Sequence, residues 1–186
     1  ISYSVIDQRA KKDMTDFCQA NQVKLLAYGT LAGGFLSEKW LGVPEPEEGQ
    51  LKKWSQMKYK RFIEVGGGWE LFQKILYRLH EMAKSYDVSI ANVAGRYILE
   101  DPAVGGIIIG MRTGDNEHIC ENSQIFNLEL SEADRSVITD ALEVFGMIPG
   151  DCGDEYRTAP FLTASGDLSD HFEDAPAPYI KKKLST

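Results

Sequence analysis

The chain has 186 residues, 43% of them hydrophobic and 10% aromatic, which is enough apolar material for a compact domain with a sizeable core. Its net charge is -8 and its longest basic run is the three lysines at 181–183, so a nucleic-acid partner is not expected. No apolar run reaches the roughly 18 residues of a membrane span, and the three scattered cysteines favour reduced thiols. We therefore expect a cytoplasmic protein without a membrane partner.

Short apolar runs rich in β-branched residues predict three β-strands buried on both faces, at residues 2–6, 23–28 and 106–109. The first run begins almost at Ile1, which is not a methionine, and no other segment leads into it. We interpret this start as that of a cut or truncated chain.

Apolar residues at spacings of three and four predict four helices, over residues 11–20, 69–86, 90–99 and from 131 onwards. One common face of the first helix is expected to carry Met14, Phe17 and Cys18. Ser89 is placed as the N-cap of the third helix, and Ser131 forms a capping pair with Asp134 at the start of the fourth. Strands that alternate with helices imply parallel βα units and an α/β fold.

Two regions interrupt this alternation. Residues 37–68 form a long insertion for which no element is predicted and which could cover a site. Its aromatic residues either line a substrate pocket or anchor the insertion to the rest of the fold: Trp40, Trp54, Tyr59, Phe62 and Trp69. We divide the chain into a domain at 1–145 and an acidic tail containing Gly and Pro at 146–186, which we expect to run over the surface.

Three segments resemble the C-terminal half of the aldo-keto reductase superfamily: residues 25–36 (LLAYGTLAGGFL), 88–102, and 106–122 (GIIIGMRTGDNEHICEN). In that family Tyr-Ser-Pro-Leu-(Ala or Gly)-x-Gly-x-Leu follows the seventh barrel strand, and here Gly29 and Thr30 replace Ser and Pro. The family's last strand leads into Gly-x-(Arg or Ser)-x5-hydrophobic-x-Glu-Asn, which this chain reproduces closely. The resemblance implies the C-terminal part of a (β/α)8 barrel, incomplete in this chain.

Tyr28 would lie at the C-terminal end of a parallel strand, at the barrel mouth. There its ring either caps the core or offers a platform on which a flat heterocycle stacks, and the resemblance implies the nicotinamide ring. The glycines of the following loop either form a turn or let a backbone approach a pyrophosphate closely. The resemblance places Gly29, Leu31 and Gly33 among the cofactor-binding residues.

Arg112 and Thr113 follow the last strand directly, where a guanidinium, a hydroxyl and helix amides converge in a way that suits a phosphomonoester. An exposed surface arginine is the alternative. The resemblance implies that these residues bind the 2′-phosphate of NADP, that Glu121 and Asn122 bind the adenine edge, and that His118 takes the place of a second arginine. NADP is therefore expected in preference to NAD.

Members of this family reduce carbonyls by hydride transfer, with a catalytic tyrosine, lysine, aspartate and histidine that all precede the first strand of this chain. A (β/α)8 barrel needs about 250 residues, so the N-terminal half of the barrel is missing. The resemblance thus implies no catalytic residue in this chain, and the segment alone is expected to be inactive.

Replacement catalytic sets are not convincing. Tyr3, Asp7 and Lys11 or Lys12 could mimic a tyrosine, an acid and a lysine, but surface salt bridges explain the charged residues equally well. Cys152 could pair with His171, or form a metal site with Asp151, Asp154 and Glu155. The spacing fits no zinc or calcium pattern, so we expect a loop cysteine beside solvated carboxylates and no metal.

These interpretations predict an NADP-dependent oxidoreductase that acts on an aldehyde or ketone, with this chain supplying part of the cofactor cleft. The alternative is a redox-silent NADP-binding regulatory module, as in the potassium-channel β-subunit branch of the superfamily. A third possibility is a degenerate gene copy that needs a partner to bury its open sheet edges.

Overall fold

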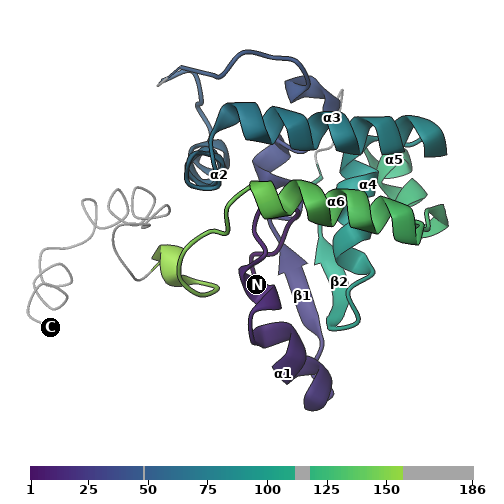
Figure 1. The fold of residues 1–186 in the computed structure, drawn as a ribbon. Coiled ribbons are helices and arrows are strands. Elements are labelled where there is room, and N and C mark those ends of the chain that lie inside the picture. The colour runs from purple at the N-terminus through teal and green to yellow at the C-terminus, as the bar shows by residue number, and fades with distance from the viewer. Residues whose placement is uncertain (48, 112–117, 157–186) are drawn as a thin grey trace, which may run out of the picture.

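A computed structural model describes residues 1–47, 49–111 and 118–156, in which helices pack against two parallel strands (Figure 1). The strands are β1 (Leu25–Tyr28) and β2 (Val104–Ile108), and Tyr28 pairs with Ile108 at the ends of both. The connection between them contains three of the six α-helices in the described part of the chain, since parallel strands require a long crossover. The predicted α/β class with parallel strands is confirmed.

The first predicted strand, at residues 2–6, is wrong in extent. Ser2 forms a single parallel bridge with Tyr28, whose backbone N–H donates to the carbonyl of Ile1 over 2.8 Å. The chain then turns back, because Ser4 and Asp7 exchange backbone hydrogen bonds of 3.1 and 3.2 Å. The apolar run is buried, as its composition requires, but most of it is a buried turn rather than a strand.

Local sequence signals predict three of the helices correctly: α3 (Trp69–Tyr86), α4 (Ile90–Leu99) and α6 (Glu132–Val144). The Ser89 side chain accepts a hydrogen bond from the backbone of Asn92, and Ser131 forms a capping box with Asp134. These caps satisfy amides that helix geometry leaves without partners. Their positions therefore define where α4 and α6 begin.

The helix predicted at 11–20 is divided into a 3-10 turn at Arg9–Lys11 and α1 (Met14–Ala20). Within α1, Cys18 is buried and Met14 packs partly against the core, whereas Phe17 is 63% exposed. Residues four apart lie on one helix face, so Met14 and Cys18 turn inward together without Phe17.

The region at 37–68 contains an unpredicted helix, α2 (Trp54–Val65), together with a 3-10 turn at Glu38–Trp40. Of the five aromatic residues predicted either to line a pocket or to anchor this region, four are buried, and the Trp40 and Trp69 rings meet edge to face with centroids 5.8 Å apart. The Trp69 indole donates to the carbonyl of Val43 over 2.9 Å. This packing favours the interpretation in which the aromatics anchor the insertion, with Trp54 remaining exposed.

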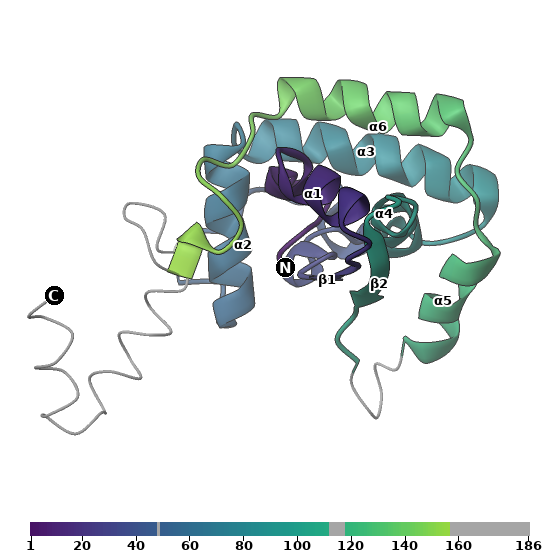
Figure 2. The ribbon, with the colours of Figure 1, turned by 90° about the horizontal axis from the view of Figure 1, so that it is seen from below.

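The helices cover one side of the sheet. Helices α3 and α6 run side by side in both views, and α5 (Ile119–Ser123) follows β2 (Figure 2). On the covered face of β1, Leu25 and Ala27 are buried. On the opposite face Leu26 is 58% exposed and Ile108 is 56% exposed, so that face of the strands is open. Among the described helices, none is long and apolar enough to cross a membrane.

Residues 146–156 pack against the fold. Gly146 donates its amide to the carbonyl of Gly66 over 2.6 Å, and Ile148 is buried. A 3-10 turn at Asp154–Tyr156 follows, with Glu155 completely buried. This first part of the predicted tail is therefore held to the fold by specific contacts.

Candidate functional site

Tyr28 lies at the C-terminal end of β1, and its ring is only partly buried. Its hydroxyl donates to that of Tyr156 over 3.4 Å, and the Lys58 ammonium lies 5.7 Å from the ring centroid. Burial, and then the hydrogen bond with Tyr156, raise the pKa of Tyr28 above its usual value. Tyr28 is thus a neutral, flat ring at the end of the strand.

The loop after β1 is shaped by glycines at positive φ. Gly29 has a φ of 67°, and a Cβ there would lie 1.9 Å from the hydroxyl of Tyr59 on α2. Gly33 has a φ of 65°, and a Cβ there would lie 3.0 Å from the carbonyl oxygen of Ser55. The room that these two glycines leave is therefore taken by α2, whereas a Cβ on Gly34 would have no neighbour within 4 Å.

The second group of predicted cofactor residues begins at α5. Nδ1 of His118 lies 2.7 Å from a carboxylate oxygen of Glu121, and both side chains are accessible to solvent. Asn122 is partly exposed, and its backbone N–H donates to the carbonyl of His118. Arg112 and Thr113, for which we predict contact with a phosphate, lie outside the described residues.

A cluster of four buried charges lies beside Tyr28, and the sequence interpretation missed it. Arg9 binds both carboxylate oxygens of Asp7, at 2.7 and 2.8 Å, and reaches Glu155 at 2.8 Å. The second oxygen of Glu155 lies 3.4 Å from the Lys58 ammonium. Two positive and two negative charges therefore balance, which is the condition for keeping such groups out of water.

The cluster shifts the ionisation of its members in opposite directions. Burial alone would raise the pKa of Glu155, but the hydrogen bond from Arg9, a backbone hydrogen bond and the charges of Arg9 and Lys58 together outweigh burial and lower it. Burial alone would lower the pKa of Arg9, but the hydrogen bonds and negative charges of Asp7 and Glu155 together outweigh burial, so the pKa of Arg9 is above its usual value. Both side chains are thus held in their charged forms.

The candidate replacement sets are not assembled. Tyr3 is buried and donates its hydroxyl to Asp101 over 2.8 Å, so it does not join Asp7 and Lys11. The expected surface role of Asp7 is wrong, because Asp7 is completely buried in the charge cluster. Lys11 instead contacts the hydroxyl of Tyr97 at 3.1 Å.

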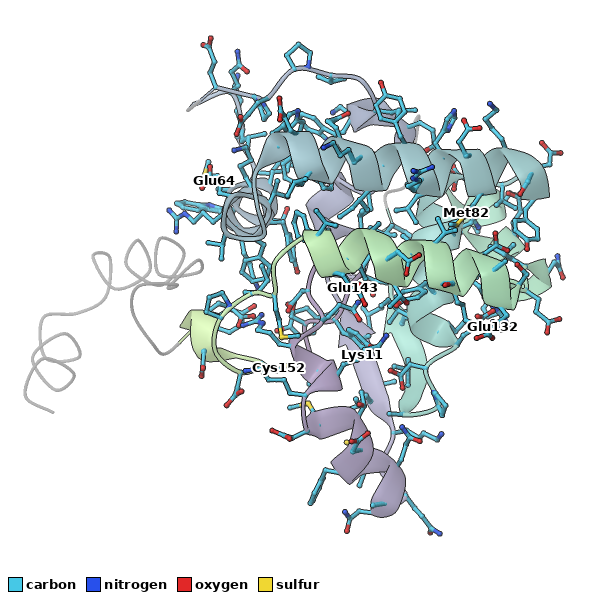
Figure 3. The ribbon with its side chains drawn as sticks, in the orientation of Figure 1. Lys11, Glu64, Met82, Glu132, Glu143 and Cys152 are labelled. Carbon is cyan, nitrogen blue, oxygen red and sulfur yellow. The ribbon has the colours of Figure 1, made fainter. Side chains whose placement is uncertain are left out.

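Cys152 follows α6 and lies next to the N-terminal segment, with its sulfur 3.9 Å from the carbonyl oxygen of Ser2 (Figure 3). Burial raises the pKa of this thiol to about 11, so at neutral pH it is protonated and a poor nucleophile. The expected solvated carboxylates next to it are wrong for Glu155, which is buried. Within the described ranges, no group of His, Cys, Asp and Glu could hold a metal ion.

Few features of the sequence indicate the charge cluster. Glu155 pairs with a residue 146 positions away and with another 97 positions away, so no spacing rule connects them. A polar residue within an apolar run, such as Asp7 after Val5 and Ile6, was the one local signal of a buried charge.

Comparison with known proteins identifies the class of protein to which this fold belongs. The sequence model of the aldo/keto reductase family matches residues 1–143, so the chain belongs to this family. In structure it is similar to a thermostable aldo-keto reductase solved with the inhibitor epalrestat, with a TM-score of 0.51 and 22% identity over 76% of this chain. That match covers 38% of the other chain, so the predicted partial barrel is confirmed.

Two relatives are similar in sequence. A Schizosaccharomyces pombe protein named as an aryl-alcohol dehydrogenase is 28% identical over 106 residues, which cover 55% of this chain and 30% of that protein. Protein tas of Escherichia coli is 26% identical over 130 residues, which cover 70% of this chain and 35% of that protein. The chain thus spans about a third of the length of the curated relatives it matches.

Proposed function

We propose that the protein is an NADP-dependent oxidoreductase that reduces an aldehyde or ketone by hydride transfer, and that this chain supplies part of its cofactor cleft. The observation that carries the proposal is the partly exposed Tyr28 ring at the carboxyl end of β1, in a chain of the aldo/keto reductase family. Sites in barrels of parallel strands are built at this end. A cytoplasmic location belongs to the same proposal, since all three cysteines are thiols.

The residues present fit a dinucleotide. The bound cofactor would supply the hydride, Tyr28 would orient the nicotinamide ring, and the loop with Gly29, Leu31 and Gly33 would adjoin the pyrophosphate. The open space at Gly34 leaves one side of that loop free of α2. Arg112 and Thr113 would bind the 2′-phosphate, with His118 beside them, and the partly exposed Glu121 and Asn122 offer acceptors and a donor for the adenine edge.

The proton donor is assigned to another part of the barrel. Burial is the first cause that raises the pKa of both Tyr28 and Tyr59, which makes these two phenols weaker acids than free tyrosine. We propose that the N-terminal half of the barrel brings the catalytic residues. The same half would cover the open strand face that carries Leu26 and Ile108.

The test is titration of NADPH and NADH into the protein expressed from its complete gene, with nicotinamide fluorescence as the readout. Replacing Arg112 with alanine should weaken NADPH binding about tenfold or more and NADH binding much less, because only NADPH carries the 2′-phosphate. Arg78→Ala, on the exposed face of α3, is the matched control and should change neither affinity.

Turnover then separates the two candidate functions. Oxidation of NADPH that depends on an added aldehyde or ketone would support the reductase. Saturable NADPH binding without turnover of any carbonyl would favour the redox-silent regulatory module. Absence of NADPH binding by the folded protein would refute both.

A further inference from the structure

We infer that the turn Asp154–Tyr156 is a positioning element for the nicotinamide end of the cofactor cleft, in which Tyr156 and Lys58 hold the ring of Tyr28 in place. This inference rests on the proposed function. It assigns a role to residues that lie more than a hundred positions after Tyr28 and that follow the stretch matched by the family model.

Buried ion pairs of Glu155 hold the turn in place. Glu155 lies between Arg9, at 2.8 Å, and Lys58, at 3.4 Å. Arg9 also donates to the carbonyl of Asp151 over 3.0 Å, and Gly153 donates its amide to the Glu155 carboxylate over 3.0 Å. The backbone that leads into Tyr156 is therefore fixed in two ways. The Glu155 side chain is held by ion pairs, and the Asp151 carbonyl and the Gly153 amide are hydrogen-bonded.

Tyr156 transmits this anchoring to Tyr28. The Lys58 ammonium donates to the Tyr156 hydroxyl over 2.6 Å, and the same hydroxyl accepts the hydrogen bond from Tyr28 over 3.4 Å. The ammonium also lies 4.4 Å from the Tyr156 centroid and 5.7 Å from that of Tyr28. One cation thus contacts both rings. The Tyr28 ring is held at its hydroxyl by Tyr156, and its Cα is held by strand β1.

Stability alone is a weak reason for this arrangement. A buried ion pair often stabilises a fold no more than apolar residues of the same size would, but it does fix its members in one geometry. Stacking of two flat rings depends on their offset and tilt, so a fixed ring plane matters at this position. The cluster lies at the carboxyl end of β1, where that geometry is needed.

The test compares two ligands that differ in the nicotinamide. NADPH carries it and 2′-phospho-ADP-ribose lacks it, while both carry the 2′-phosphate and the adenine. Tyr156→Phe and Lys58→Met should each weaken NADPH binding about fivefold, the effect of one hydrogen bond, and leave 2′-phospho-ADP-ribose binding within about twofold of the original. Lys58→Arg, which keeps the charge, should recover part of the loss.

Lys60→Met is the matched control, because Lys60 lies on the same helix and is also ion-paired, with Glu45 and Glu64. It should change the affinity for neither ligand. The inference is overturned if Tyr156→Phe and Lys58→Met leave NADPH binding unchanged, or if they weaken both ligands equally, as a general disturbance of the fold would. An original protein that binds neither ligand would refute the proposed function itself, and with it this inference.

Discussion

Tyr28 and Glu121 belong to the same proposed cofactor cleft, but their surroundings differ. Beside Tyr28, the charged side chains of Asp7, Arg9 and Glu155 are buried and mutually hydrogen-bonded. The side chain of Glu121 has an exposed contact with His118, the residue just before its short helix α5. One end of the cleft is part of the core, and the other is a surface feature.

This difference indicates how each end would respond to substitution. Ion pairs that are shielded from water interact strongly and leave a large penalty when one member is removed, whereas exposed pairs are screened and contribute little. Changes to the buried charges of Asp7, Arg9 and Glu155 should therefore act through the stability of the fold. Changes on α5 should act through ligand contacts alone.

The largest effect is expected for Arg9→Met, because it leaves the carboxylates of Asp7 and Glu155 buried without their main partner. The free energy of unfolding should fall by about 3 kcal/mol or more. Denaturant unfolding measures this change, with Arg78→Ala as a control that should shift stability by less than about 0.5 kcal/mol. A loss of under about 1 kcal/mol for Arg9→Met would show that the buried cluster contributes little.

The next effect in size concerns Gly29. An alanine there combines a positive φ with a Cβ that overlaps the Tyr59 hydroxyl, so Gly29→Ala should cost about 2–3 kcal/mol of unfolding free energy. Gly34→Ala also has a positive φ but meets open space, and it should cost only about 1 kcal/mol. Equal losses in the two variants, measured by thermal or denaturant unfolding, would mean that α2 does not pack against Gly29 as described.

A smaller effect is expected from pH. The pKa of Glu155 in the folded state is below its ordinary value of 4.5, so the folded state binds fewer protons than the unfolded state. The stability that Glu155 contributes is therefore present above its unfolded-state pKa and is lost as the pH falls toward the folded-state pKa. Unfolding free energies between about pH 5 and pH 3 should decline less steeply in Glu155→Gln than in the original protein. Parallel declines would contradict this assignment.

The smallest effect is expected for His118→Ala, which removes the exposed contact with Glu121. Its unfolding free energy should stay within about 0.5 kcal/mol of the original, because an exposed pair of this kind contributes little. Calorimetric melting is the measurement. A loss as large as that of Arg9→Met would mean that α5 is as integral to the core as the Tyr28 end, and the contrast between the two ends would disappear.

The sequence predicts best those features that depend on neighbours along the chain. Helix α3 follows from apolar spacing alone, and the caps at Ser89 and Ser131 define the starts of α4 and α6. Helix α2 was missed because its buried face includes Lys58, Tyr59 and Lys60, so that no apolar stripe marks it. Lys58 is buried beside the distant Glu155, and Lys60 is paired with Glu64 one turn away and with Glu45.

The candidate site divides in the same way. Tyr28 and the glycines after it were predicted from one local motif, and the structure places them together at the end of β1. Their role in binding a cofactor stays a prediction. The contacts of Tyr28 with Lys58 and Tyr156 depend on tertiary structure, and no local rule predicts that these three residues meet.

The sequence separation of Glu155 from Lys58 and Arg9 also affects how the protein is made. Lys58 is synthesised 97 residues before Glu155, and Arg9 is synthesised still earlier. At roughly 5–20 residues per second, a ribosome needs about 5–20 seconds to add the intervening residues. During that interval Lys58 has no Glu155 to pair with, and Arg9 has only Asp7. The buried charges around Tyr28 can therefore be balanced only after Glu155 has been synthesised, later than the other segments that surround them.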